Sequence, residues 1–384
     1  SNFTFTNRTN IHFRNLSFMY SGAAFPENGY SEIQSDVFVP GAFYAEGVKN
    51  LTIEGNHFAH IGTYTIKLGP GCKDNRIVGN RIHDIGSGGI MIGETDDPES
   101  QLTLTTRTTI TDNYLYDMGH IYLAGAGIWI GRSSHNHVAH NEIYDILGNA
   151  ISVGWKWAEE LTDAHHNVIE YNHIHDIGNK KLGGGSGIYT LSRQPGTTIR
   201  YNLIHDLQRY HDKYWKPGHR TAHPCFGLQL DRGSSQMTFE YNVIYNVTDN
   251  AYKHMNTANV VRNNIFAFTG DYVAVKRGKD RFKGTVLFHQ NIVVSNNGKL
   301  MGEKWLKEDC EVDYNIYWDV SGEIADFTGM DFNNWQQAGY DPHSLFTDPL
   351  FEDPLNGDFT LKQESPAFDI GFVPIDISNV GPRK

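Results

Sequence analysis

Short segments in which apolar and polar residues alternate recur along most of the chain. Side chains alternate between the two faces of a strand, so each segment predicts a strand with one face in a core and the other available for contacts. In the clearest example Leu228 and Leu230 share one face, and Gln229 and Asp231 share the other. Related glycine- or alanine-framed segments are 89–93, 127–131, 150–154, 187–191 and, more weakly, 251–255.

A second repeat consists of an asparagine followed by an apolar pair and a small polar turn. It occurs at Asn56, Asn80, Asn113, Asn141, Asn172, Asn202, Asn242, Asn264, Asn291 and Asn315, with Asn15 as an expected earlier member. Successive members are 22 to 40 residues apart, which is typical of solenoid coils that carry loop insertions. Stacked side-chain amides can bond along such a ladder, so the column is interpreted as structural.

These patterns predict an all-β fold: a right-handed parallel β-helix with loop insertions along one face and a C-terminal cap. No long stretch with a 3.6-residue apolar period separates the strands, which argues against a βαβ fold. Residues 1–317 are expected to form the helix, with about eleven coils, and 318–384 a capping segment packed on it. Because the first residues already read as a strand, we expect that an N-terminal part is missing.

Composition and net charge exclude several classes of function but add little to the fold prediction. The net charge of −12 over 384 residues argues against a general nucleic-acid binder, which needs a basic surface. Three widely spaced cysteines indicate neither a disulfide framework nor a zinc site, and no apolar run is long enough for a membrane span. A secreted or periplasmic location is expected, although the chain contains no signal peptide. The oligomeric state is not indicated.

When the strand segments are aligned, their outward-facing side chains form columns, and these columns predict a groove. Trp129 and Tyr189 are candidates for stacking on sugar rings, together with Trp155 and Trp157 just beyond the strands. The alternative is that Trp129 and Tyr189 are ordinary aromatics under loops. Gln229, Lys253 and His254 are further candidate substrate-binding residues, and Arg193 and Arg232 suggest an anionic group on the substrate, unless they pair with acidic neighbours.

Hydrolysis of a glycosidic bond normally needs two carboxylates. Asp231 supplies one, at the end of its strand, but the adjacent coil has no acid at the matching positions. The longest insertion, Gln208 to Phe226, leads directly into the Asp231 strand and contains Asp212 and His223. These two residues are the candidate catalytic partners, with Glu159 as a more distant alternative.

Several motifs together resemble the β-helix glycosidases of glycoside hydrolase family 141, a family with α-L-fucosidase and xylanase activities, and more distantly the family 120 β-xylosidases. The resemblance covers nearly the whole chain. Its main elements are Gly29 to Gln34, Val39 to Ala42, Phe58 to His60, Ile92 to Glu94, Gly127 to Gly131, Ile151 to Trp157, Tyr171 to His175, Gly187 to Leu191 and Pro374 to Gly381.

The resemblance implies one catalytic aspartate just before the Gly-Ile-Tyr strand and a second in the turn of the next coil. Asp231 matches the second position, whereas Gly184 stands where the first is expected and Arg232 replaces an acidic neighbour. Residues Tyr252 to Met255 also depart from a histidine-rich pattern. Either another acid has replaced the missing one, or the chemistry differs.

The leading hypothesis is a glycoside hydrolase of the bacterial glycan-degrading type that acts on plant, marine or host polysaccharides with Asp231 as a catalytic carboxylate. An alternative is a polysaccharide lyase that uses Lys253, His223 or Tyr189 as base while Arg193 or Arg232 neutralises a uronate. A third is a non-catalytic glycan-binding β-helix. No cofactor or metal is predicted; Ca²⁺ is compatible with either reaction, but no ligand spacing indicates it.

Overall fold

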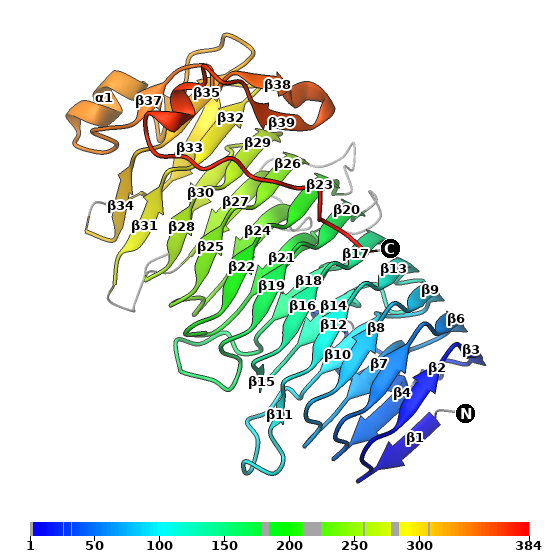
Figure 1. Cartoon of the computed structure of the whole chain (residues 1–384). Helices are drawn as coiled ribbons and strands as arrows, with labels where there is room; N and C mark the ends of the chain where they lie inside the picture. The colour runs from blue at the N-terminus through cyan, green and yellow to red at the C-terminus, as the bar shows by residue number, and fades with distance from the viewer. Residues whose placement is uncertain are drawn as a thin grey trace.

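The chain winds into a parallel β-helix built of three long sheets (Figure 1). The structure is a computed structural model that describes residues 3–25, 27–31, 33–178, 184–209, 224–255, 258–277, 284–305 and 308–383. Along most of the helix a coil contributes one strand to each sheet, and strands of successive coils pair in parallel. We call the sheets I, II and III in the order in which the chain first enters them.

Sheet I carries the outward columns expected from the sequence. Its strands, in spatial order, are β1 (Phe3–Thr6), β4 (Gly41–Glu46), β7 (Tyr64–Leu68), β10 (Ile90–Ile92), β14 (Ile128–Ile130), β18 (Ile151–Val153), β21 (Ser186–Thr190), β24 (Phe226–Leu230), β27 (Asn250–His254), β30 (Ala274–Lys276), β33 (Lys299–Glu303) and β36 (Asp326–Phe327).

Sheets II and III complete each coil. Sheet II contains β2 (His12–Arg14), β5 (Thr52–Glu54), β8 (Arg76–Val78), β12 (Thr109–Thr111), β16 (His137–Ala139), β19 (Val168–Glu170), β22 (Thr198–Arg200), β25 (Thr238–Glu240), β28 (Val260–Arg262), β31 (Val286–His289) and β34 (Cys310–Asp313). Sheet III contains β3 (Ser17–Ser21), β6 (His57–Ile61), β9 (Arg81–Ile85), β13 (Tyr114–Met118), β17 (Glu142–Ile146), β20 (His173–Ile177), β23 (Leu203–Leu207), β26 (Val243–Val247), β29 (Ile265–Thr269), β32 (Ile292–Ser295), β35 (Ile316–Asp319) and β37 (Leu345–Phe346).

The core fills the space enclosed by the three sheets. Equivalent positions of successive coils carry apolar side chains, such as Ile143, Ile174 and Ile204 of sheet III, which are fully buried. The parallel register therefore turns each apolar position of the repeat into a continuous column. Two further apolar clusters lie outside the sheets, one over sheet I and one between sheet III and the cap.

The asparagine column forms an uninterrupted ladder from Asn56 to Asn315. Each side-chain carbonyl accepts from the backbone N–H and side-chain amide of the asparagine one coil before it, at 2.8–3.2 Å. The preceding residue is in the left-handed region at every coil, as in Tyr171 and Tyr201 (both φ 54°). The amides thus satisfy the backbone groups that this sharp corner would leave unpaired.

The ladder corrects one expectation. Asn15 has φ 53° and occupies the left-handed position, so it is not the earlier ladder member. Leu16 stands there, and its backbone N–H donates to the Asn56 side chain at 2.9 Å. The physical reason is that a left-handed residue and the ladder residue are consecutive, and asparagine suits both positions.

The cap begins inside the last coil. Strands β36 and β37 pair with β33 and β35, so residues after 317 still extend sheets I and III. The short helix α1 (Phe332–Gln337) and the antiparallel pair β38 (Phe351–Asp353) and β39 (Asp358–Leu361) follow, and Phe351 and Phe359 pack on the outer face of sheet III. None of the described helices has the length and hydropathy to cross a membrane.

The C-terminal segment runs back from the cap along the ladder corner (Figure 1). The Val373 backbone is bound by Asn263 at 2.7 Å, and the Gly381 N–H donates to the carbonyl of Tyr171 at 2.9 Å. Arg383 forms a bidentate ion pair with Asp112, at 2.9 and 2.7 Å. The segment therefore ties the cap to coils near the middle of the helix.

Replacing Asn172 by alanine should lower the free energy of unfolding by about 2–4 kcal/mol, because it leaves buried backbone groups of two neighbouring coils unpaired. Its amide donates to the carbonyls of Val138 and Glu170 and to Asn202. Urea denaturation followed by circular dichroism measures the change. The matched control is Asn333→Ala on the exposed face of α1, which should shift the midpoint little; equal shifts would contradict a structural role for the ladder.

Candidate active site

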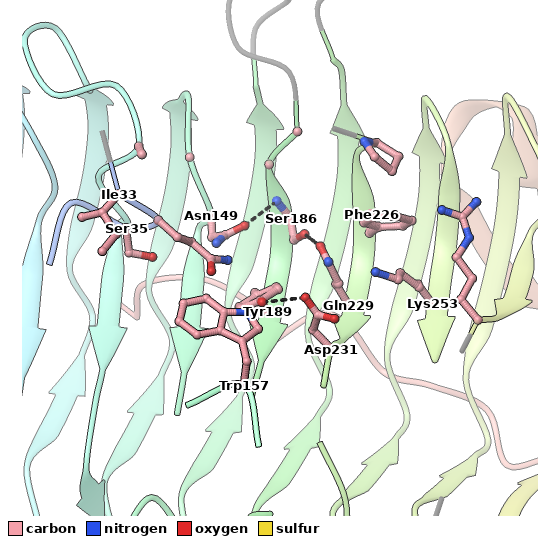
Figure 2. Close-up of a pocket in the computed structure, with 17 residues that line it drawn as sticks. Ile33, Ser35, Asn149, Trp157, Ser186, Tyr189, Phe226, Gln229, Asp231 and Lys253 are labelled. Carbon is pink, nitrogen blue, oxygen red and sulfur yellow. Dashed lines mark hydrogen bonds between the residues drawn. The ribbon is translucent and has the colours of Figure 1, made fainter. Parts of the chain in front are cut away.

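A cavity of about 680 Å³ lies on the outer face of sheet I, over β21, β24 and β27. Residues 33–35, 124, 148–149 and 157 line one side, and residues 184–186 form part of its wall. The floor carries Tyr189, Gln229, Asp231 and Lys253 (Figure 2). Arg277 also lines the cavity. The cavity thus combines an acid, a phenol and two cationic side chains.

The register of sheet I positions the floor. Ser152 pairs with Tyr189, Tyr189 with Gln229, and Gln229 with Lys253, so these side chains stand side by side on consecutive strands. The outward column expected from the sequence is confirmed at these positions. Alternation then puts Asp231 on the same face as Gln229, one step beyond the end of β24.

Tyr189 and Asp231 form the central pair of the cavity. The Tyr189 hydroxyl donates to Oδ2 of Asp231 at 2.7 Å (Figure 2), and the backbone N–H of Arg232 donates to Oδ1 at 2.9 Å. Burial, followed by the negative charge of Asp231, raises the pKa of Tyr189 far above its ordinary value. The phenol therefore stays protonated and can act as a hydrogen-bond donor.

Lys253 and Arg277 both lie over the ring of Phe226. The Lys253 ammonium lies 4.9 Å from the ring centroid, and the Arg277 guanidinium carbon lies 5.9 Å from it. Burial lowers the pKa of Lys253; the charge of Asp231 raises it and that of Arg277 lowers it. A buried amine beside a second cation loses its proton more readily than a free lysine.

A polar network holds the wall of the cavity against its floor. The Ser186 hydroxyl donates to Gln229 at 2.6 Å, and the Ser186 N–H donates to the Asn149 side chain at 3.0 Å (Figure 2). Gly184, with φ +86°, begins this wall. The position where the family resemblance implies an acid is thus at the cavity but carries no side chain.

Three of the four expected sugar-stacking residues are buried; Tyr189, 2% exposed, still lines the cavity, whereas Trp129 and Trp155 do not. Trp129 is 0% exposed, and Trp155 is 8% exposed and packs against it at a centroid distance of 5.7 Å. Both belong to an apolar cluster on the outer face of sheet I that Val37 and Val39 cover. Their assignment to the substrate site is therefore corrected, because the covering segment leaves neither ring free to meet a ligand. Trp157, 40% exposed, does line the cavity.

Of the other candidate substrate-binding residues, Gln229 and Lys253 line the cavity, whereas His254, Arg193 and Arg232 do not. His254 is fully buried on the inner face, where its Nδ1 bonds to the Tyr252 hydroxyl at 2.7 Å, because alternation turns it away from Lys253. Arg193 lies at a corner, bridged to Leu161 and Ser235, and neither it nor the Arg232 side chain lines the cavity. Asp212 and His223 fall outside the described residues.

Sequence reasoning missed several lining residues. Arg277 follows β30, one coil beyond the last pattern segment, and no alternation marks it. Phe226 faces the cavity because the strand changes its alternation at Gly227, where a Cβ would lie 2.3 Å from Ile244 of the core. Gln34 and Ser35 arrive from the first long insertion, whose docking site no local signal reveals.

Comparison with known proteins agrees with the fold. Residues 41–219 match the family model described as right handed beta helix region, which confirms the handedness expected from the sequence. No curated protein matches the chain significantly. The fold class predicted from the sequence, an all-β right-handed parallel β-helix, is therefore confirmed.

Solved structures of similar shape include carbohydrate-active enzymes. A protein described as a glycoside hydrolase matches with TM-score 0.49 and 20% identity, over 62% of this chain and 37% of its own. XylC in complex with xylose matches with TM-score 0.48 and 15% identity, over 81% and 55%. The family 6 alginate lyase AlyGC matches with TM-score 0.46 and 13% identity, over 98% and 55%. The chain thus spans about a third to half of these proteins, and scores this low carry no conclusion about the reaction.

Asp231→Asn should lower the pKa of Lys253 further below the usual 10.5, because it removes a negative charge that raises this pKa. The pH dependence of acetylation of the Lys253 amine, followed by mass spectrometry, measures the midpoint. The matched control is Asp348→Asn in the exposed cap, which should leave the midpoint unchanged. A wild-type midpoint at or above 10.5, or no shift in Asp231→Asn, would contradict the electrostatic account of the site.

Proposed function

We propose that this protein is a carbohydrate-active enzyme whose cavity binds an oligo- or polysaccharide that carries an anionic group. The observation that carries this proposal is that Lys253 and Arg277 line the same cavity as the Tyr189–Asp231 pair. Burying the Lys253 ammonium costs free energy of desolvation, and an anionic group such as a uronate offsets that cost. A secreted or periplasmic location, where polymeric glycans occur, fits this role.

The first candidate reaction is glycoside hydrolysis with Asp231 as acid/base or nucleophile. The resemblance to glycoside hydrolase family 141 favours it. Among the described residues Asp231 is the only carboxylate that lines the cavity, whereas hydrolysis normally uses two, about 5–9.5 Å apart. Asp212, with His223 as the other candidate, is therefore proposed to supply the second catalytic group from the insertion.

The second candidate reaction is elimination on a uronate, and the cations of the cavity favour it. Lys253 would take the proton from the carbon next to the carboxylate, and Arg277 would neutralise that carboxylate. The single proton of the Tyr189 hydroxyl, which Asp231 accepts at 2.7 Å in this structure, would turn to the leaving glycosidic oxygen as the C–O bond breaks and a C=C bond forms. The Tyr189 phenolate would then regain a proton from solvent, and Lys253 would release to solvent the proton that it took. Elimination needs no group outside the described part of the chain.

A substrate panel tests the proposed function. The protein is incubated with polyuronates and, at equal concentration, with neutral xylan-type and fucosylated glycans, while new reducing ends and the ultraviolet absorbance of an unsaturated uronide are recorded. Cleavage of a uronate-containing glycan is expected. Reducing ends without absorbance identify hydrolysis, and both rising together identify elimination. Cleavage of the neutral glycans alone would contradict the proposed anionic substrate.

Variants separate the two reactions. Asp231→Asn should lower kcat by about 10²- to 10⁴-fold in hydrolysis, because a general acid/base or nucleophile is lost. Lys253→Met should lower kcat to a similar degree in elimination, but mainly raise KM in hydrolysis, because Lys253 then only binds the anion. Steady-state kinetics measure both effects, with Asp348→Asn as the control. Full turnover by both Asp231→Asn and Lys253→Met would exclude this cavity as the active site.

A further inference from the structure

A cluster of histidines and one glutamate lies on the outer face of sheet III, away from the cavity on sheet I. Glu142 of β17 pairs in register with His173 of β20, and His175 of β20 pairs with His205 of β23. Oε1 of Glu142 lies 3.3 Å from Nε2 of His175 and 3.6 Å from Nδ1 of His173. One ligand atom from each of Glu142, His173 and His175 lies within 4.8 Å of the other two.

Hydrogen bonds around the cluster fix where the imidazole protons are. Nδ1 of His175 lies 2.8 Å from the carboxylate of Asp176, and Nδ1 of His205 lies 2.6 Å from that of Asp206. A carboxylate accepts, so in both rings Nδ1 carries the proton and Nε2 is left with a lone pair. Nε2 of His205 therefore accepts from Nε2 of His173, at 2.9 Å.

The remaining nitrogen of His173 is then also a bare acceptor. With its proton on Nε2, His173 turns the lone pair of Nδ1 toward Glu142. Three acceptors, Nδ1 of His173, Nε2 of His175 and Oε1 of Glu142, thus converge with no proton left to join them. Converging lone pairs repel one another, and a cation between them removes that repulsion.

The two separations from Glu142 fit a small tetrahedral ion. Ligands about 2.0–2.1 Å from such an ion lie about 3.3 Å from each other, close to the two separations from Glu142. The side chains of Glu142, His173 and His175 are 26%, 26% and 16% exposed, so solvent can supply a fourth ligand. Carboxylates commonly orient metal-bound histidines. Here Asp176 orients His175, and Asp206 orients His205, which in turn holds His173.

We propose that Glu142, His173 and His175 bind a divalent transition-metal ion, for which Zn²⁺ is the probe. The ion would join β17 to β20 across two adjacent coils. The chain from β20 continues to the cavity wall at residues 184–186, so an ion here would steady one of the coils that form the cavity. Sequence reasoning found no metal site, because its ligands come together only through the register of two coils.

Zinc binding by the untagged, chelator-stripped protein tests the proposal by isothermal titration at pH 7.5. One ion per chain is expected. Glu142→Gln and His173→Gln each remove a ligand and should lower the affinity at least about 100-fold, and Asp176→Asn about 10- to 100-fold. His166→Ala, in a separate histidine cluster with His135 and His165, is the matched control and should bind as the wild type does.

Crystals soaked with Zn²⁺ give a readout that needs no variant. An anomalous peak within about 2.2 Å of the three ligand atoms would support the proposal. Saturable binding lost only in His166→Ala would overturn it. A zinc-soaked crystal without a peak between Glu142, His173 and His175, or unchanged affinity in Glu142→Gln and His173→Gln, would do the same.

Discussion

The hydrogen bonds between stacked asparagine side chains set the register on which the rest of the structure depends. Each corner of the coil turns through a left-handed residue, and the next residue must pair backbone groups that this turn leaves open. Each asparagine side chain from Asn56 to Asn315 pairs such groups in its own coil and in a neighbouring coil. Because the ladder fixes every coil against the next, side chains that are 22 to 40 residues apart in sequence become neighbours.

That register builds two different surfaces from one repeat. On sheet I, apolar contacts cover the outward positions around Trp129, whereas Tyr189, Gln229 and Lys253 line the cavity. On sheet III the same stacking brings His173 and His175 beside Glu142. The sites on this fold therefore depend on which columns of outward-facing side chains remain uncovered and on which residues those columns contain.

The sequence predicted those parts of the structure that repeat. The fold class, the ladder and the outward column through Tyr189, Gln229 and Lys253 follow from local periodicity, and the structure confirms them. Asn15 was misplaced by one residue, since asparagine also suits the left-handed position that it occupies.

The errors and omissions arise from contacts that no repeat encodes. The burial of Trp129 depends on a distant insertion that folds over sheet I, and Phe226 turns into the cavity through an irregularity at Gly227. Arg277 lies one coil beyond the last pattern segment. The metal-ligand geometry around Glu142 combines two strands with spacings that no single-strand motif contains.

The central claim is that the cavity on sheet I binds an anionic saccharide between the two cations and the Tyr189–Asp231 pair. A crystal structure with a bound uronate oligosaccharide tests this claim most directly. The account predicts a sugar carboxylate within hydrogen-bonding distance of Lys253 or Arg277 and a glycosidic oxygen beside Tyr189 or Asp231. Saccharide bound at another surface, with the cavity unoccupied, would contradict it.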